Sequence, residues 1–251
     1  MKEYGLIGYP ISHSFSEKYF SEKFHKENIT DSVYKLYPIE DIDSFPEFIR
    51  NNPNIEGLNV TIPYKESIIK YLDELDMDAK LIGAVNTIKI KRKAGKIKLT
   101  GYNTDAAAFE NSLKPYLKSQ HNKALILGSG GGSKAIQFVL KKLGILYRIV
   151  THRPLKANYI AYCSLTKSFI QNYKIIINST PLGMYPDVDS CPDIPYKYLC
   201  EDHILFDLVY NPPQTRFLRQ GKEKCKVTIN GQKMLELQAD LSWKLWKGNG
   251  N

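Results

Sequence analysis

Short apolar runs alternate along this chain with segments of helical spacing. The runs at 4–8, 33–38, 55–62, 123–127, 147–151, 174–178 and 204–209 predict strands, and 83–91 with 96–102 predict a hairpin that turns at Ala94 and Gly95. Helices are predicted at 16–27, 41–50, 64–71, 104–117, 132–143 and 234–246, with Asp41 and Thr104 as caps. Strands separated by helix-length segments predict an α/β fold with parallel sheets and right-handed crossovers.

The length of 251 residues allows one large domain or two modest ones, each with its own core. No apolar run approaches the ~20 residues that span a bilayer, and the first residues lack the apolar segment of a signal peptide. We therefore expect a cytoplasmic protein with no membrane partner. The four cysteines form no CxxC pair and the five histidines are dispersed, so we expect reduced thiols and no metal site.

The basic excess of the chain, a net charge of +9, is concentrated in one region. Between Glu110 and Asp187 there is no acidic residue, whereas eleven Lys and Arg residues occur there. A field of this sign attracts polyanions, and both the phosphates of a dinucleotide and RNA qualify.

A glycine-rich turn follows the predicted strand 123–127 and precedes a predicted helix. Its sequence is Gly128-Ser129-Gly130-Gly131-Gly132. Glycines at such a turn let the backbone approach a pyrophosphate, whose charge then lies at the helix N-terminus. The turn predicts a dinucleotide site, and a plain structural turn is the alternative.

The end of the next strand, 147–151, distinguishes between two cofactors. NAD sites usually carry an Asp or Glu about 20 residues after the glycine turn, where it binds the ribose hydroxyls. This chain has no acid there and instead continues with Arg153 and Lys156. Both could hold a 2′-phosphate, although they could also be solvated loop charges. The missing acid favours NADP.

Two further segments carry candidate chemistry. Ser14 and Ser16 lie at a strand-to-helix junction that suits a carboxylate, although Ser16 alone could be a helix cap. In 59–66, NVTIPYKE, the two-residue period of a strand places Asn59 and Thr61 on one side, and Lys65 follows at the start of the next predicted helix.

Lys65 alone would be an ordinary surface lysine. Two other motifs offer polar groups that could lie near it: the amide of Asn86 in GAVNT (83–87) and the carboxylate of Asp105 in GYNTDA (101–106). Lys65 and Asp105 would form an acid–base pair suited to the proton that accompanies hydride transfer.

These motifs together resemble the shikimate dehydrogenase family. The resemblance rests on Gly8-Tyr9-Pro10 through Ser14-x-Ser16, on NVTIPYKE, GAVNT and GYNTDA, and on GSGGGSKA (128–135), INSTPLGM (177–184), FDLVYNPPQT (206–215) and GQKMLELQA (231–239). It covers residues 5–239. It implies two α/β domains: an N-terminal substrate domain of residues 1–103 with 232–251, to which the C-terminal helix returns, and a Rossmann-like NADP-binding domain of residues 104–231.

The resemblance implies NADPH-dependent reduction of 3-dehydroshikimate to shikimate, a step of chorismate and aromatic amino acid biosynthesis. It implies Lys65 and Asp105 as the catalytic pair and Ser14 and Ser16 at the substrate carboxylate. The other residues that it places at the substrate are Thr61, Asn86, Tyr210 and Gln238. Those that it places at the cofactor are Gly128, Gly130 and Gly131 at the pyrophosphate, Arg153 at the 2′-phosphate, and Thr180, Gly183 and Met234 near the ribose and nicotinamide.

This chain departs from the family pattern in its cofactor half. Lys134 stands where the family commonly has an arginine, and the stretch from Arg153 to Lys174 is short, so we expect one strand–helix unit to be abbreviated.

Other functions stay open at this point. One is a dehydrogenase that accepts quinate as well as shikimate and uses NAD, which the acid-free stretch after Thr151 disfavours. Another is a nucleic-acid-binding module, although the lysines are spread over strands and helices without a known motif. A third is an inactive regulatory relative, which the presence of both Lys65 and Asp105 disfavours. The sequence is compatible with a homodimer and does not fix the oligomeric state.

Overall fold

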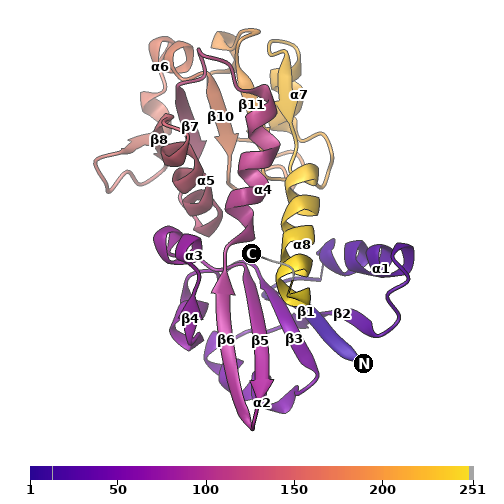
Figure 1. Ribbon diagram of the computed structural model, residues 1–251. Coiled ribbons are helices and arrows are strands. Elements are labelled where there is room, and N and C mark those ends of the chain that lie inside the picture. Colours follow the sequence, from indigo (N-terminus) through magenta and orange to yellow (C-terminus); the bar gives the residue numbers. More distant parts are fainter. Residues whose placement is uncertain (13, 249–251) are drawn as a thin grey trace. The chain divides into compact units, whose positions relative to one another are not determined.

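The computed structural model describes residues 1–12 and 14–248 and divides into two compact units (Figure 1). Unit 1 comprises Met1–Asp105 and Glu236–Asn251, and unit 2 comprises Ala106–Leu235. The two divisions fall inside helices α4 (Thr104–Leu113) and α8 (Gln232–Lys247).

Unit 1 contains a six-stranded mixed sheet in the order β2-β1-β3-β5-β6-β4. Its strands are β1 (Lys2–Gly8), β2 (Ser32–Pro38), β3 (Ile55–Val60), β4 (Glu74–Leu75), β5 (Thr87–Lys93) and β6 (Lys96–Tyr102). Strand β1 pairs in parallel with β2 and β3, whereas β3 with β5 and β5 with β6 are antiparallel. The predicted hairpin is therefore present as β5 and β6, with Ala94 and Gly95 between them.

The sheet of unit 1 has an apolar core on each face, because successive residues of a strand point to opposite sides. Tyr4 and Leu6 of β1 belong to one core, which includes Phe20 of α1 (Ser16–Lys26) and Trp243 of α8. Ile7 belongs to the other core, which includes residues of α2 (Phe45–Asn51) and α3 (Met77–Ile82).

Two predicted helices of unit 1 take a different form. The prediction at 41–50 becomes a 3₁₀ turn, η1 (Ile42–Ser44), followed by α2, and the Asp41 side chain accepts from the Asp43 amide as expected of a cap. Pro46 stands in the first turn of α2, where a missing N–H is tolerated. The helix expected at 64–71 is a turn followed by the 3₁₀ helix η2 (Ser67–Tyr71), so Lys65 lies in the turn rather than at a helix start.

Unit 2 contains a six-stranded sheet in the order β12-β11-β10-β7-β8-β9, with all pairs parallel. Its strands are β7 (Lys123–Leu127), β8 (Leu146–Thr151), β9 (Tyr159–Ala161), β10 (Ile175–Asn178), β11 (Ile204–Asp207) and β12 (Val227–Ile229). Counted from β7, this is the 3-2-1-4-5-6 order of dinucleotide-binding domains. In such sheets ligands bind beyond the carboxyl ends of the two strands where the order reverses, which here are β7 and β10.

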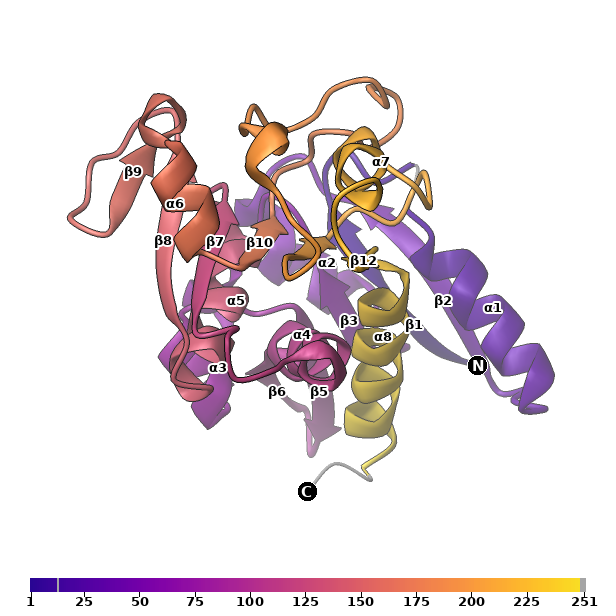
Figure 2. The same cartoon turned by 90° about the horizontal axis from the view of Figure 1, so that it is seen from above.

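Helices cover both faces of the unit 2 sheet. Figures 1 and 2 show α5 (Gly131–Lys142) on one face and α6 (Lys167–Asn172) and α7 (Arg216–Lys222) on the other. The predicted helix 104–117 ends earlier, because α4 stops at Leu113 and a 3₁₀ turn, η3 (Lys114–Tyr116), contains Pro115.

The connection between β8 and β9 contains no helix, and this is where the chain was expected to be abbreviated. Residues 152–158 run directly from one parallel strand to the next, and the three-residue β9 is followed by a 3₁₀ turn, η4 (Tyr162–Ser164), and the six-residue α6. Arg153 and Lys156 are exposed on this connection. The expected strand–helix unit is therefore present in a short form, as β9 and α6.

Candidate active site

Lys65 and Asp105 form an ion pair in unit 1. Lys65 Nζ lies 2.6 Å from Asp105 Oδ2, and their side chains are 17% and 11% exposed. Asp105 is the second residue of α4, where the helix dipole favours a carboxylate. A lysine in a surface turn would normally extend into water, so its low exposure and its partner distinguish it from a solvated charge.

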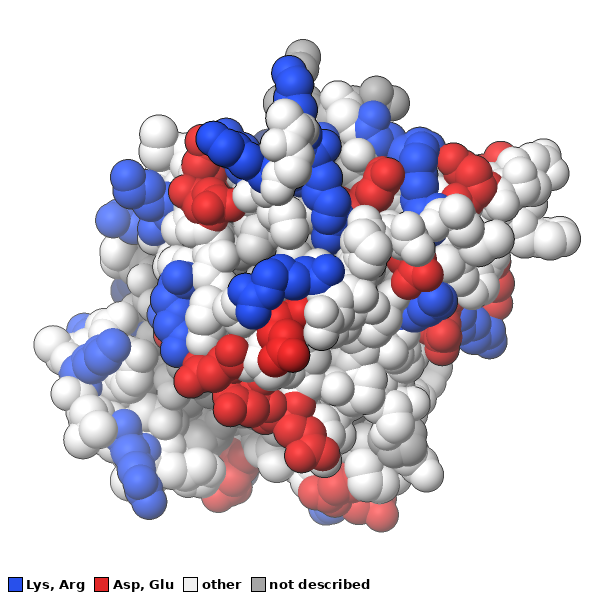
Figure 3. All heavy atoms as spheres, turned by 90° about the horizontal axis from the view of Figure 1, so that it is seen from below, with Lys and Arg blue, Asp and Glu red and all other residues white. Residues whose placement is uncertain are grey.

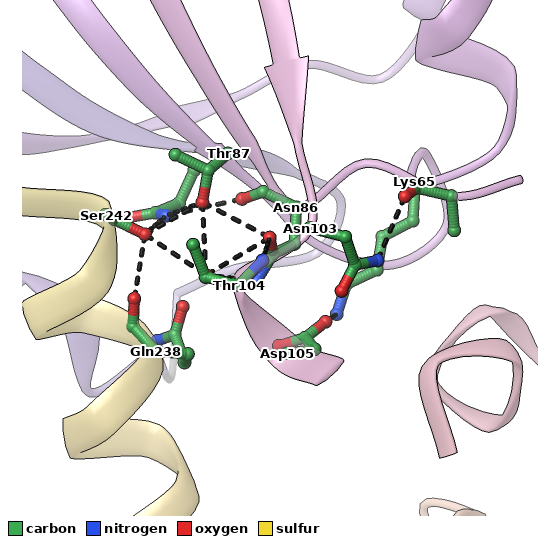
Figure 4. A network of polar contacts seen from close by, with 10 residues as sticks. Lys65, Asn86, Thr87, Asn103, Thr104, Asp105, Gln238 and Ser242 are labelled. Atoms are coloured by element: carbon green, nitrogen blue, oxygen red, sulfur yellow. Dashed lines mark hydrogen bonds and ion pairs between the residues drawn. The ribbon is translucent and has the colours of Figure 1, made fainter. Parts of the chain in front are cut away.

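Val85 and Asn86 contact the Lys65 turn and Thr104, the residue before Asp105, and Figure 4 shows Asn86 beside Thr104. The Val85 amide donates to the Lys65 carbonyl oxygen at 2.7 Å. The Asn86 side-chain oxygen accepts from the Thr104 amide at 2.7 Å, and Asn86 Nδ2 donates to Thr104 Oγ1 at 2.9 Å. The Lys65 turn and the first turn of α4 are thus fixed to the same short segment.

A buried polar network continues from Asn86 to α8. Ser242 Oγ lies 2.8 Å from Thr87 Oγ1 and 3.3 Å from Thr104 Oγ1, and it accepts from Asn59 Nδ2 at 2.9 Å. Ser242 and Thr87 are fully buried, and Asn59 is nearly so. Thr104 was expected to act as a helix cap, but it is the first residue of α4 and its hydroxyl contacts this network instead.

We expect the Ser242→Ala variant to lose stability. The substitution removes a hydroxyl that bonds Asn59 and Thr87 in a buried site, and each lost hydrogen bond costs about 0.5–1.5 kcal/mol. Urea unfolding of the purified variant measures the change in the free energy of unfolding. Lys244→Ala, an exposed change in the same helix, is the control and should stay within about 0.5 kcal/mol of the wild type. Equal stability of the two variants would show that the network is energetically neutral.

The two serines expected at a carboxylate lie at the start of α1. Ser14 Oγ accepts from the Ser16 amide at 3.2 Å, and Ser16 is almost completely buried. Ser16 also contacts the Tyr34 hydroxyl, which donates to Asn59 Oδ1 at 2.8 Å, and burial raises the pKa of Tyr34 well above its usual value. The polar network at the start of α4 therefore extends to Ser16. His13, between the two serines in sequence, lies outside the described residues.

The remaining residues expected at the substrate are distributed over both units. Thr61 follows the last residue of β3 and is half-buried, and Gln238 is half-buried in the part of α8 that belongs to unit 1. Tyr210 is half-buried in the segment after β11 of unit 2. Asn86 is only 3% exposed, and both ends of its amide are used within the protein.

The glycine turn lies at the carboxyl end of β7 in unit 2. Gly128 has φ +100°, and a Cβ there would lie 2.7 Å from Thr180 Cγ2 of the segment after β10. Gly130 precedes the first residue of α5, which is Gly131, and a Cβ on Gly130 would meet no atom within 4 Å. Open space before the N-terminus of this 12-residue helix suits a pyrophosphate.

The other residues expected at the cofactor also lie in unit 2. Thr180 and Gly183 follow β10, where Thr180 donates twice to Asn178 Oδ1 and Gly183 has φ +86°. Met234 is buried near the start of α8. The Arg153 side chain is exposed on the connection after β8, and Lys134 is half-buried in α5.

Sequence reasoning did not single out two buried polar residues at strand ends of unit 2. Asn178 ends β10, Asp207 ends β11, and both side chains are completely buried. Burial raises the pKa of Asp207 to about 6, although hydrogen bonds from Thr215, Val209 and Asn178 oppose this rise. A polar residue that closes an otherwise apolar strand is the sequence signal that could have identified them.

Charges of both signs are mixed on the face of the molecule in Figure 3, where Lys and Arg side chains lie among Asp and Glu. This face therefore presents no continuous basic surface. Within residues 1–12 and 14–248, no group of three or more His, Cys, Asp or Glu side chains could hold a metal ion. Within the same residues, no helix is both long and apolar enough to cross a membrane.

Comparison with known proteins gives a consistent result. The family model described as the shikimate dehydrogenase substrate binding domain matches residues 6–88. A shikimate dehydrogenase (NADP(+)) of Methanococcus aeolicus is 38% identical, over 97% of this chain and 91% of that protein.

Two solved structures are also similar to this chain. A shikimate dehydrogenase from Peptoclostridium difficile aligns with a TM-score of 0.86 and 38% identity, over 100% of this chain and 93% of that one. A shikimate 5-dehydrogenase from Thermus thermophilus, solved with NADP(H) and shikimate, aligns with a TM-score of 0.84 and 28% identity, over 99% and 94%. The similarity extends over both units, so this chain belongs to the shikimate dehydrogenase family.

Proposed function

We propose that this chain catalyses the reversible, NADPH-dependent reduction of 3-dehydroshikimate to shikimate, a step of aromatic amino acid biosynthesis. The observation that carries the proposal is the Lys65–Asp105 ion pair, with its low exposure, in the unit that contains the matched substrate-binding domain. Relatives that cover nearly the whole chain have the name shikimate dehydrogenase (NADP(+)). We propose residues 1–103 with 232–251 as the substrate domain and 104–231 as the cofactor domain.

Lys65 is the proton donor in this proposal. Its ammonium gives a proton to the ketone oxygen as that oxygen gains negative charge, and the same positive charge stabilises the oxygen electrostatically. Asp105, 2.6 Å from Lys65 Nζ, keeps the ammonium in place and compensates its charge in a site with little water. In the reverse direction Lys65 accepts the proton from the hydroxyl.

Polar groups around this pair would orient the substrate. The hydroxyls of Ser14 and Ser16 would donate to the carboxylate, which also benefits from the N-terminus of α1. Thr61, Tyr210, Gln238 and Asn86 would contact the ring hydroxyls or the carboxylate. Asn86 Nδ2 has two hydrogens, of which the described residues use one, for Thr104 Oγ1, so the other would donate to a ligand oxygen.

The glycine turn of unit 2 fits a dinucleotide. Gly130 leaves open the volume that a side chain would occupy, and Gly128, Gly130 and Gly131 would hold the pyrophosphate at the N-terminus of α5. Thr180, Gly183 and Met234 would lie near the ribose and nicotinamide, and Arg153 would bind the 2′-phosphate. NADPH, when bound, supplies the hydride that reduces the ketone carbon.

We expect purified protein to oxidise shikimate with NADP⁺ far more efficiently than with NAD⁺. The acid that binds the ribose hydroxyls in NAD sites is absent after β8, whereas Arg153 provides paired donors for a 2′-phosphate. Absorbance of the reduced nicotinamide gives kcat/KM for each cofactor. Arg153→Ala should lower kcat/KM with NADP⁺ about tenfold, in line with a charge-assisted hydrogen bond, and leave the NAD⁺ value unchanged.

Three outcomes of this assay are informative. No reduction of NADP⁺ in the presence of shikimate would refute the proposed function. Equal kcat/KM values for the two cofactors would refute the role of the basic connection after β8. Turnover of quinate at a comparable rate would instead identify a dehydrogenase with both substrates.

A further inference from the structure

A completely buried carboxylate lies at the carboxyl end of β11, next to the segments expected to hold the cofactor. Asp207 receives three hydrogen bonds: Asn178 Nδ2 and the Val209 amide donate to Oδ1, each at 3.0 Å, and Thr215 Oγ1 donates to Oδ2 at 2.5 Å. No charged side chain among the described residues contributes to its raised pKa. A buried charge without an ion-pair partner is costly. The three donors that converge on Asp207 indicate that this carboxylate is kept because its neighbours need a hydrogen-bond acceptor at this position.

The first of these contacts leads to Thr180. While Asn178 Nδ2 donates to Asp207, the Asn178 oxygen accepts from the Thr180 amide at 3.1 Å and from Thr180 Oγ1 at 2.6 Å. Asn178 Nδ2 also donates to the Leu182 carbonyl oxygen at 3.3 Å. The orientation of the Asn178 amide, and with it the path of residues 179–182, therefore depends on the acceptor at Asp207.

The second contact leads to Gly183. Thr215 is completely buried and caps α7 by accepting from the Leu218 amide. A Cβ on Gly183 would lie 3.3 Å from Thr215 Cβ, so the Thr215 side chain packs directly against this glycine. The Asp207 carboxylate fixes the Thr215 rotamer by accepting a hydrogen bond from its hydroxyl. The rotamer in turn fixes the side-chain surface that packs against Gly183.

We propose that Asp207 is a positioning residue of the cofactor site: through Asn178 and Thr215 it fixes the loop 179–183 that presents Thr180 and Gly183. The proposal rests on the proposed function, because it takes Thr180 and Gly183 to be cofactor contacts. Asp207 itself is buried beneath the loop and acts only through these two neighbours.

NADPH binding to purified variants, measured by the fluorescence of the bound dinucleotide, tests this proposal. Asp207→Asn keeps the shape and one acceptor but presents an NH₂ group to Thr215, and we expect the Kd for NADPH to rise about tenfold. At saturating NADPH, kcat should stay within about twofold of the wild type, because the chemical groups of unit 1 are untouched. Thr215→Val, which replaces the hydroxyl by a methyl group and also removes the cap of α7, should give part of the same rise. Ile176→Val in β10, which removes one buried methyl group, is the control and should leave the Kd unchanged.

A double-mutant cycle separates positioning from general loosening of unit 2. If Asp207 acts through Asn178 and Thr215, Asp207→Asn should raise the Kd of the Asn178→Ala protein by a smaller factor than it raises that of the wild type, because only the path through Thr215 remains, whereas independent effects would multiply. Unchanged NADPH affinity in both Asp207→Asn and Thr215→Val would overturn the proposal, and so would multiplying effects. If the variants prove too unstable for the cycle, the NADPH Kd of Thr215→Val compared with that of Ile176→Val still tests the proposal. Wild-type protein that binds no NADPH would instead refute the proposed function.

Discussion

Replacing Lys65 by alanine is expected to lower kcat for shikimate oxidation by about 10²–10⁴-fold, the usual contribution of a positioned acid–base group. The structure gives the reason, since Lys65 is held 2.6 Å from Asp105 with little exposure to solvent. Steady-state kinetics with saturating NADP⁺ measure the change. Because the lysine also stabilises charge on the reacting oxygen, KM should change much less than kcat.

A second lysine of the same segment is the control for this prediction. Lys70 lies in η2 and forms an exposed ion pair with Asp43, and such pairs are worth little. Lys70→Ala should therefore keep wild-type kinetics. Removing Lys65 also leaves Asp105 without its partner, so thermal unfolding must show that Lys65→Ala is folded at the assay temperature. A folded Lys65→Ala protein with near wild-type kcat would exclude the proposed proton transfer.

Gly128→Ala is expected to weaken NADPH binding by about 10–100-fold. A non-glycine residue is strained by about 1–3 kcal/mol at a positive φ of this kind, and the new Cβ would lie 2.7 Å from Thr180 Cγ2. The turn and the Thr180 segment would have to separate, and both belong to the proposed cofactor site. Equilibrium titration with NADPH gives the Kd, and thermal unfolding gives the accompanying loss of stability.

Variants at two other glycines distinguish the effect of backbone strain from the effect of a lost cofactor contact. Gly144 follows α5 with φ +69°, and a Cβ there meets nothing within 4 Å, so Gly144→Ala should cost about 1 kcal/mol of stability without changing the Kd. Gly130→Ala should fold as the wild type and still lose affinity, because only a bound pyrophosphate would need that space. Wild-type affinity in both Gly128→Ala and Gly130→Ala would place the dinucleotide elsewhere.

Elements with long apolar runs or tight-turn residues could be predicted from the sequence. The strand and glycine turn that end at Gly132 and the hairpin around Gly95 are examples. Short elements could not be predicted from the sequence. Helix α3 has six residues and strands β9 and β12 have three each, which is too short for a periodic pattern, and their neighbours in the fold determine their conformation. A proline explains one shifted end, at Pro115 after α4.

In the candidate site, too, only residues in distinctive local motifs could be predicted from the sequence. Lys65 and Asp105 could be selected because each stands in a distinctive local motif, and the structure places them in contact, while their catalytic role stays a prediction. The buried polar network next to this pair could not be predicted from the sequence. Asn59 and Ser242 are separated by 183 positions in the chain, so no local spacing connects them. Asn86 was expected at the substrate, and only the structure reveals that it also anchors the start of α4.

The division of unit 1 between the two ends of the chain determines the order in which it folds during synthesis. Tyr4, Phe20 and Tyr34 are synthesised well before α8, but their apolar core includes Trp243 and Trp246 of that helix. Unit 2 is one uninterrupted segment and can fold first. The part of this core that packs on Trp243 and Trp246 therefore stays uncovered until the last turns of α8 emerge. During that interval this nascent chain exposes the kind of surface that chaperones bind.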